Sequence, residues 1–330
     1  MNNTHFFFID RLKGFTILLV VMGHVGLFSM HPFDTSIFRF ISSFHMPLFM
    51  FLSGWVISPP RTKINITKKI IKYLIPFVFF GTLFSLYMTD SFTIHNLINS
   101  SNFLLGESKN GYWYFLSLAI FYSSLFLFQL NKQNKWWYDI LISGVIYTIF
   151  YYGWRRTGLL SNILCLEHAV CFYPFYILGV LSRKYKIVES LINQNKIFTL
   201  ALFLYIGLAA LEPSHLPHHL YTIISRFLIP LFAIIVYIYF FATRESKDSK
   251  IERQLSLFGT NTLSIYALHY FILYKIDLEV LCPCFNKNNN TFILFLVILF
   301  ISIIVTYSSI YAGNLIKMSN WIRKWIYNER

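Results

Sequence analysis

The sequence predicts an all-α, polytopic integral membrane protein with about ten transmembrane helices and both termini in the cytoplasm. Three observations support this fold class: an apolar composition, a series of long apolar stretches, and an uneven distribution of basic residues. Of the 330 residues, 56% are hydrophobic, 20% are aromatic and only 13% are charged, and the mean hydropathy is +0.56. A soluble domain usually carries about a quarter charged residues, so this composition argues against a soluble domain, a disordered tail or a disulfide-rich secreted scaffold.

Ten apolar stretches are candidates for crossing a bilayer, whose hydrocarbon core takes about 20 residues of helix. No water reaches the peptide groups inside lipid, so each stretch is expected to be helical. The sixth and seventh stretches are the shortest. In order, the expected spans are Gly14 to Met30, Phe40 to Ile57, Tyr73 to Met88, Tyr112 to Leu130, Ile140 to Trp154, Ala169 to Leu181, Ile197 to Leu211, Leu220 to Thr243, Leu257 to Tyr274 and Phe292 to Ala312.

The basic residues are concentrated between alternate spans. With the N-terminus placed in the cytoplasm, all but seven of the 28 Lys and Arg residues fall on the cytoplasmic side, which is the bias typical of membrane proteins. This distribution supports the span count and the orientation, and it explains the net charge of +14 without a nucleic-acid partner. The seven exceptions are Arg39, Lys109, Arg155, Arg156, Arg226, Lys275 and Lys287.

The first stretch reads as a retained helix rather than a cleavable signal. It lacks a small-residue cleavage site, and a second span follows it at once. The chain shows no internal repeat, no low-complexity tract and no linker long enough to separate two domains. We therefore expect one transmembrane domain over residues 1–330.

Ionisable side chains inside membrane spans are costly and therefore mark candidate functional sites. Lys13 precedes His24 by eleven residues, which at about 100° per residue is about 20° from three full turns, so the two share one helix face. Asp10 lies on the same face and is spaced i, i+3 from Lys13, whereas Arg11 projects elsewhere. With Lys13 at the cytoplasmic boundary, His24 lies about 16 Å deeper, near the middle of the membrane.

An imidazole at that depth, aligned with a cation and a carboxylate at the cytoplasmic mouth, suits proton transfer near neutral pH. His24, Lys13 and Asp10 are therefore the candidate catalytic residues. The alternative is that His24 only hydrogen-bonds a neighbouring helix, as polar residues inside membranes often do.

Two further histidines are expected near His24. Leu257 is predicted to start the ninth span, and twelve residues of helical rise then place His269 about 18 Å deep, similar to His24. Tyr266 precedes His269 on this span, so a polar contact between helices is the simpler explanation for His269. His45 is close to the outer end of the second span and is expected to face the same cavity.

Polar residues at the outward ends of several spans form, with His45 and His269, a candidate acceptor pocket. Outward loops always carry some charge, so for any single member the plain structural explanation is favoured. The outward residues are Arg39, Arg155, Arg156, Glu167, His168 and Arg226.

Three lysines, Lys68, Lys69 and Lys72, open the third span. Basic residues there are suited to holding the phosphates of a cytoplasmic cofactor. Alternatively, they are topology anchors.

The four cysteines, Cys165, Cys171, Cys282 and Cys284, are expected near the outward side, where an oxidising compartment would permit disulfides. Cys-Pro-Cys alone is a poor zinc signature, and no metal is expected.

Five segments together resemble the acyltransferase-3 family of integral membrane acyltransferases, which includes bacterial polysaccharide O-acetyltransferases. The first reads IDRLKGFTILLVVMGH, the second FHMPLFMFLSGW and the last FGTNTLSIYALH. Each segment alone is a weak hydrophobic pattern, whereas five in family order are fairly specific. The segments are Ile9 to His24, Phe44 to Trp55, Trp113 to Leu116, Phe172 to Gly179 and Phe258 to His269.

In this family a basic residue, Lys or Arg, precedes an essential histidine by eleven positions, and Lys13 and His24 match that spacing. The resemblance implies an acyl-CoA donor, most often acetyl-CoA, which approaches from the cytoplasm. It also implies a glycan hydroxyl, free or lipid-linked, as the acceptor. Family members of this size have about ten spans, and the expected location is the inner membrane of a bacterium.

The predicted reaction is transfer of an acetyl group to a cell-surface glycan, with His24 as the general base. Lys13 is expected to position or neutralise the donor and Asp10 to orient Lys13, while a covalent acyl-histidine is the mechanistic alternative. A rival from another class is a transporter or flippase of a lipid-linked sugar or small polar solute. Against it stands the lack of a detectable inverted repeat.

Overall fold

The computed structural model of the protein describes residues 7–29, 36–57, 63–89, 93–106, 108–131, 134–211, 216–244, 249–276 and 291–327. Within these ranges every regular element is a helix, which confirms the predicted all-α class. The described chain divides into two compact units, one formed by Met1–Trp55 with Leu181–Ala312 and the other by Val56–Val180 with Gly313–Arg330. The expectation of a single domain over residues 1–330 stays a prediction.

The first unit is built from helices at both ends of the sequence. Its elements are α1 (Phe7–Ser29), α2 (Ser36–Trp55), α9 (Ile187–Leu191), α10 (Asn195–Ala209), α11 (His218–Ile223), the π-helical turn η5 (Ile224–Leu228), α12 (Ile229–Ala242), α13 (Lys250–Thr260), α14 (Thr262–Leu273) and most of α16 (Thr291–Ile316).

The second unit takes the middle of the chain. Its elements are α3 (Lys63–Met88), α4 (Ile94–Ser100), the 3₁₀ turns η1 (Ser101–Leu104) and η2 (Lys109–Gly111), α5 (Trp113–Ser124), η3 (Leu125–Leu130), α6 (Trp136–Arg156), α7 (Gly158–Ile163), most of α8 (Leu166–Lys184) and α17 (Asn320–Trp325).

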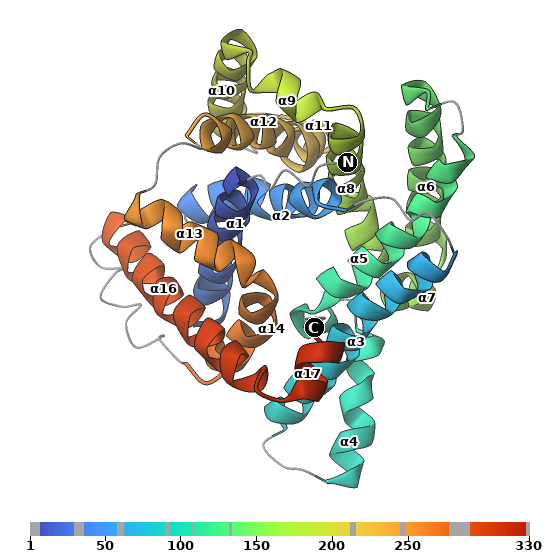
Figure 1. Ribbon diagram of the computed structural model, residues 1–330, viewed down its shortest axis with the longest axis vertical. Coiled ribbons are helices and arrows are strands. Elements are labelled where there is room, and N and C mark those ends of the chain that lie inside the picture. Colours follow the sequence, from blue (N-terminus) through green and yellow to red (C-terminus); the bar gives the residue numbers. More distant parts are fainter. Residues whose placement is uncertain are drawn as a thin grey trace. The chain divides into compact units, whose positions relative to one another are not determined.

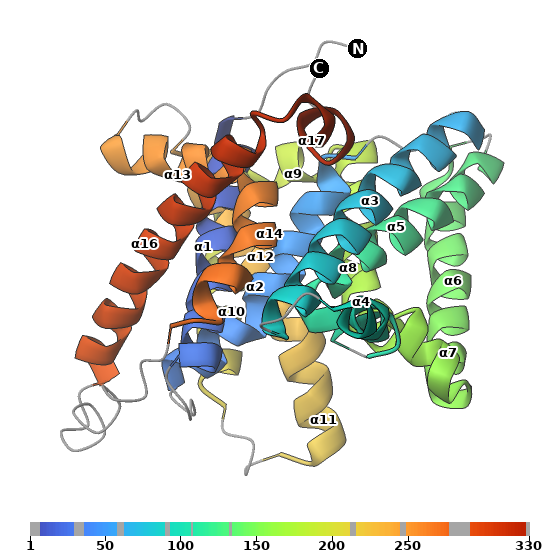
Figure 2. The ribbon, with the colours of Figure 1, turned by 90° about the horizontal axis from the view of Figure 1, so that it is seen from below.

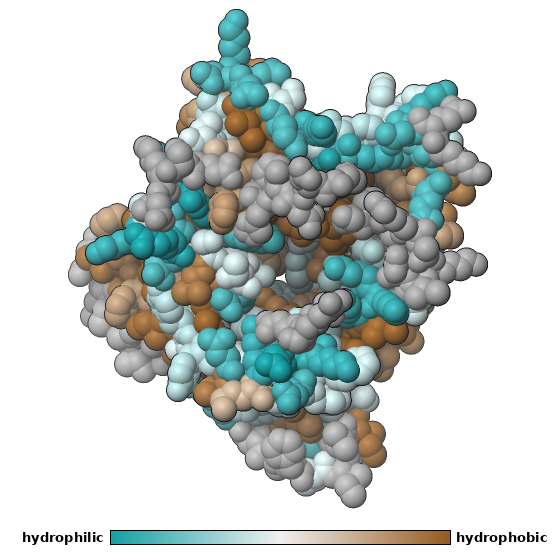
Figure 3. Space-filling view, viewed as in Figure 1, coloured by the Kyte–Doolittle hydropathy of each residue, from teal (hydrophilic) through white to brown (hydrophobic). Residues whose placement is uncertain are grey.

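Four helical segments of the described residues are long and apolar enough to cross a membrane: Ile66–Met88, Trp113–Leu130, His218–Ala242 and Phe292–Ile316. They correspond to the third, fourth, eighth and tenth expected spans. Large apolar side chains are exposed on both units and appear brown in Figure 3, as expected for surfaces that face lipid. The count of ten spans and the cytoplasmic termini stay predictions.

The ninth expected span is not one helix, which corrects the prediction for Leu257 to Tyr274. The chain turns at Asn261, whose φ of −105° and ψ of 19° end α13 and precede α14. The two helices run in different directions, as Figure 2 shows. The depth expected for His269 assumes an unbroken helix from Leu257, so it does not hold for α14.

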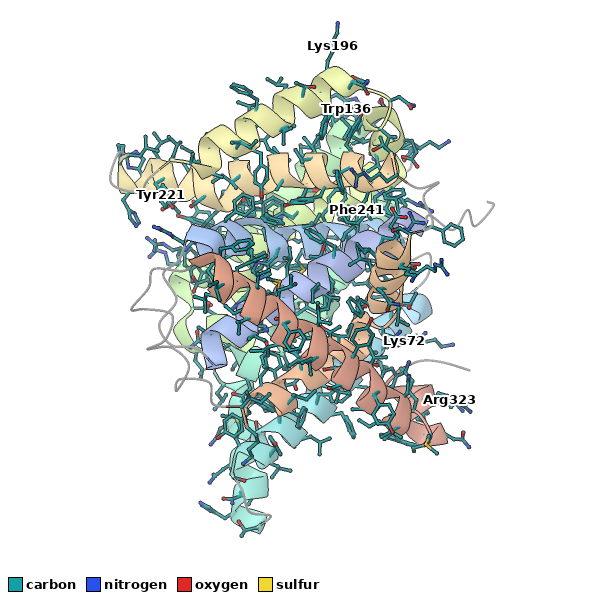
Figure 4. All side chains as sticks on the ribbon, turned by 90° about the vertical axis from the view of Figure 1, so that its left-hand side faces the viewer. Lys72, Trp136, Lys196, Tyr221, Phe241 and Arg323 are labelled. Atoms are coloured by element: carbon teal, nitrogen blue, oxygen red, sulfur yellow. The ribbon has the colours of Figure 1, made fainter. Side chains whose placement is uncertain are left out.

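Helix α1 is central to the first unit, with α13, α2, α14 and α12 packed against it (Figure 1). On its α12 side the contact is aromatic: the ring of Phe15 lies 5.2 Å from that of Tyr237 and 5.6 Å from that of Phe241. Phe241 therefore lies on the side of α12 that faces α1, whereas Lys196, at the start of α10, points away from the unit (Figure 4).

Two glycines allow α1 and α13 to approach each other closely. A Cβ atom on Gly14 would lie 1.8 Å from the carbonyl oxygen of Leu255, and one on Gly259 would lie 1.8 Å from that of Asp10. Backbone meets backbone at both points, so neither position has room for a side chain. This reciprocal contact fixes α13 against the first turns of α1, which carry Asp10 and Lys13.

The second unit contains a buried lysine at the start of the segment that leads into α5. Lys109 has no exposed surface, and its ammonium group donates to the carbonyl oxygens of Leu104 and, at 2.8 Å, Asn162. Burial lowers the pKa of Lys109 below its ordinary value. The sequence had assigned Lys109 only to the outward side, whereas its bonds show that it links η1 to α7.

We expect Gly259→Ala to lower the free energy of unfolding by about 1 to 3 kcal/mol, because the new methyl group would overlap the backbone of α1. Gly207→Ala on α10 is the matched control, since a Cβ there meets no atom within 4 Å and alanine favours helix. Thermal unfolding of both variants in detergent measures the difference. Equal melting temperatures for the two variants would contradict the close contact of α1 with α13.

Candidate active site

Residues in the first turns of α1 form two ion pairs, and the sequence predicted one of them. Lys13 Nζ lies 3.5 Å from Asp10 Oδ1, and both side chains are largely buried. This is the i, i+3 pair expected on the face that also carries His24. The carboxylate holds the ammonium at the end of α1 that is packed against α13.

Arg11 makes the contacts that the sequence did not reveal. Its guanidinium donates to the carbonyl oxygen of Arg244 at 3.2 Å and lies 3.6 Å from Glu252 Oε1. Glu252 also accepts a hydrogen bond from the backbone N–H of Ser249, in the capping box that begins α13. Arg11 therefore joins α1 to the start of α13, while Lys13 remains with Asp10.

The structure brings His24 and His269 together. His24 Nδ1 lies 2.8 Å from His269 Nε2, and the two rings are nearly parallel, with centroids 5.0 Å apart. His269 is fully buried, whereas His24 is half-buried. The two histidines come from opposite ends of the sequence and meet because α14 packs on α1.

A backbone carbonyl determines which nitrogen of each ring carries a proton. His269 Nδ1 lies 2.8 Å from the carbonyl oxygen of Ile265, which can only accept, so Nδ1 of His269 is the donor. In a neutral ring Nε2 of His269 is then an acceptor, and His24 Nδ1 must donate to it. We infer that Nε2 of His24 is left with a lone pair, which is the state a general base requires.

Tyr270 completes this site and was not recognised in the sequence. Its hydroxyl group lies 3.2 Å from His24 Nε2 and donates to it, since that nitrogen is an acceptor. The ring of Tyr270 lies 4.9 Å from that of His24 and 4.0 Å from that of His269. The only signal in the sequence was adjacency to His269, and adjacent helix residues do not normally face one partner.

His45, from the candidate acceptor pocket, belongs to the same unit as His24. Its Nδ1 donates to the carbonyl oxygen of Ile41 at 2.9 Å, one turn earlier on α2. His45 is therefore held by its own helix, with Nε2 as its acceptor nitrogen.

Two other candidates of the first unit are exposed arginines. Arg39 lies in the first turn of α2, and Arg226 lies in the π-helical turn Ile224–Leu228 between α11 and α12. A π turn inside a helix is rare, and many π turns lie at functional sites. Of these two, Arg226 has the more distinctive backbone setting.

The remaining candidates belong to the second unit and form separate groups within it. Lys68, Lys69 and Lys72 lie near the start of α3, where Lys69 stands over the ring of Tyr73 at 5.6 Å. Arg155 and Arg156 end α6 and are exposed. Glu167 and His168 begin α8, and the ring of His168 lies 4.2 Å from that of Trp113.

The cysteines give no disulfide within the described residues. Cys165 is buried and Cys171 is half-buried. Cys282 and Cys284 lie outside the described residues. Within the described ranges no group of three or more His, Cys, Asp or Glu residues is placed to hold a metal ion.

Comparison with known proteins gives one family and two relatives. A family model described as an acyltransferase domain matches residues 6–311. The nodulation protein NolL of Mesorhizobium japonicum is 28% identical over 186 residues, which cover 52% of this chain and 46% of the relative. NolL of Sinorhizobium fredii is 27% identical over 191 residues, covering 52% and 47%. The chain thus spans about half the length of these curated relatives, and no solved structure matches it.

The contact of Arg11 with Glu252 is testable by a double-mutant cycle. We expect Arg11→Gln and Glu252→Gln to couple by about 0.5 to 2 kcal/mol in unfolding free energy, because the pair is largely buried and removal of either charge strands the other. Glutamine at 252 preserves the capping box, so the cycle isolates the ion pair. Unfolding curves of the four proteins in detergent give the coupling, and additive effects would contradict the contact.

Proposed function

Because this chain belongs to the acyltransferase-3 family, whose model matches residues 6–311, we propose that it moves an acetyl group from cytoplasmic acetyl-CoA to a glycan hydroxyl. The glycan is one of the bacterial cell surface, such as an O-antigen or a capsule, and is free or lipid-linked. The enzyme acts in the inner membrane. Four long apolar helices support the membrane location, and the bacterial relatives support the setting.

One observation carries the mechanism: the hydrogen-bonded chain from the Ile265 carbonyl through His269 to His24. A thioester already has a good leaving group, so the reaction needs a base for the acceptor hydroxyl more than an acid for the thiolate. His24 Nε2 supplies that base. As the proton arrives, the new imidazolium is stabilised by its Nδ1–H bond to His269, just as a buried acceptor orients and stabilises the histidine of a hydrolase triad.

The charged group at the end of α1 serves the donor. The ammonium of Lys13 is held by Asp10, which fixes its position. A CoA thioester carries phosphates that an ammonium attracts as a point charge. Lys68, Lys69 and Lys72 are the proposed second contact for these phosphates, and Arg39, Arg226, Arg155, Arg156 and Glu167 are candidates for the acceptor. No step of the proposed reaction needs a metal ion.

An acyl-histidine intermediate is the alternative route to the same product. In that route Nε2 of His24 attacks the thioester itself, and the acceptor hydroxyl then takes the acyl group. Both routes need an unprotonated Nε2. The same tautomer therefore serves either.

Removal of the base is the direct test of the function. Purified protein is supplied with radiolabelled acetyl-CoA and a panel of envelope glycans, and label in the glycan is counted. His24→Ala is expected to lose a factor on the order of 10² to 10⁴ in rate, because the hydroxyl no longer has a base. His95→Ala, which removes an exposed histidine of the second unit, should match the wild type. Glycan crossing the membrane without acetylation would instead indicate transport.

The role of His269 is tested by what replaces it. His269→Leu fills the site but accepts no hydrogen bond, so the rate of transfer is expected to fall on the order of 10² to 10³ with little change in KM for acetyl-CoA. His269→Gln keeps an acceptor and is expected to retain more activity than His269→Leu. Equal activity of these two variants would show that the bond to His24 does not matter for transfer.

A further inference from the structure

Both ring nitrogens of His24 already have hydrogen-bond partners. An imidazole nitrogen offers one in-plane direction, which holds either its proton or its lone pair. Nδ1 donates to His269 at 2.8 Å, and Nε2 accepts from Tyr270 at 3.2 Å. A substrate hydroxyl that bonded directly to the lone pair on Nε2 would therefore compete with the hydroxyl of Tyr270.

Tyr270 is packed so that it does not give way easily. Its side chain is 3% exposed, and its ring contacts those of His24 and His269 and lies 6.4 Å from that of Tyr266. Buried side chains in close-packed surroundings stay near one rotamer, and a swing away from His24 would break these ring contacts. A route that leaves the ring where it is therefore costs less.

A phenol can donate and accept at the same oxygen. While the hydroxyl of Tyr270 donates to His24 Nε2, its oxygen keeps lone pairs that can accept from another hydroxyl. His24 is only half-buried, so part of this site is accessible from outside the protein core.

We propose that Tyr270 is a catalytic residue that carries the proton from the acceptor hydroxyl to His24, an inference that rests on the proposed acyl transfer. The acceptor O–H bond breaks and its proton joins the Tyr270 oxygen, while the proton that Tyr270 held forms the N–H bond at His24 Nε2. The acceptor oxygen forms the new ester bond at the thioester carbonyl, and the C–S bond breaks. The CoA thiolate takes up one proton, and loss of the proton on Nε2 restores His24.

Tyr270→Phe tests this assignment, because it removes the hydroxyl and keeps the ring. We expect kcat for transfer to fall about 100-fold with KM for acetyl-CoA nearly unchanged. Tyr266→Phe is the matched control: it lies one turn earlier on α14, is equally buried, and should keep kcat within about twofold of the wild type.

Measurements in mixtures of light and heavy water count the protons in flight. With a tyrosine relay two protons move together, so a plot of the wild-type rate against deuterium content should be curved. The same plot for the residual rate of Tyr270→Phe should be a straight line. A residue that merely packs beside His24 would not change the shape of this curve. A linear wild-type curve would overturn the proposal.

Fluorinated tyrosine placed at position 270 covers the case in which Tyr270→Phe does not fold. Fluorination makes a phenol more acidic and leaves its shape nearly unchanged, so kcat should differ from that of the wild type while KM for acetyl-CoA stays nearly unchanged. An unchanged kcat would overturn the proposal.

The outcomes separate this inference from the function on which it rests. Wild-type protein that transfers no label to any glycan contradicts the proposed function. Wild-type protein that transfers label, with Tyr270→Phe equally active or faster, contradicts only the relay. A faster variant would mean that Tyr270 obstructs the base in the resting protein.

Discussion

The site depends on one backbone carbonyl. Ile265 lies in α14, and its carbonyl oxygen accepts a hydrogen bond from Nδ1 of His269, one turn later. That bond sets the tautomer of His269, and the tautomer of His269 sets that of His24. The lone pair of His24 is therefore left on its Nε2. The proposed base therefore needs no carboxylate partner, whose charge would be costly inside a membrane.

The packing of α1 fixes the position of Lys13 relative to the pair His24 and His269. Gly14 and Gly259 let the backbones of α1 and α13 touch, and Arg11 ties α1 to the capping box of α13. The chain then turns at Asn261 into α14, which carries His269 and Tyr270. The close contact between α1 and α13 near Lys13 is therefore linked to His24 along α1, and to His269 through α13 and α14.

Local spacing was enough to predict part of this arrangement. Helical periodicity placed Lys13 and Asp10 in contact and put His24 on the same face, and apolar length identified the four segments that qualify as spans. Hydropathy averaged over a span did not reveal the turn at Asn261, because the run Gly-Thr-Asn-Thr at 259–262 is short and lies between apolar stretches; that run was itself a signal for a turn. Tyr270 was missed for a related reason: its partner lies more than 240 positions away, and only the packing of α14 on α1 brings the two together.

The most direct measurement of the central claim is the ¹⁵N spectrum of His24 in protein labelled at histidine, assigned with the His24→Ala variant. We expect a neutral His24 ring whose Nδ1 carries the proton and whose Nε2 does not. The spectrum should change when His269→Leu removes the acceptor for Nδ1. A His24 ring protonated at Nε2 in the wild type would contradict the assignment of this nitrogen as the base, because it would then have no lone pair to offer.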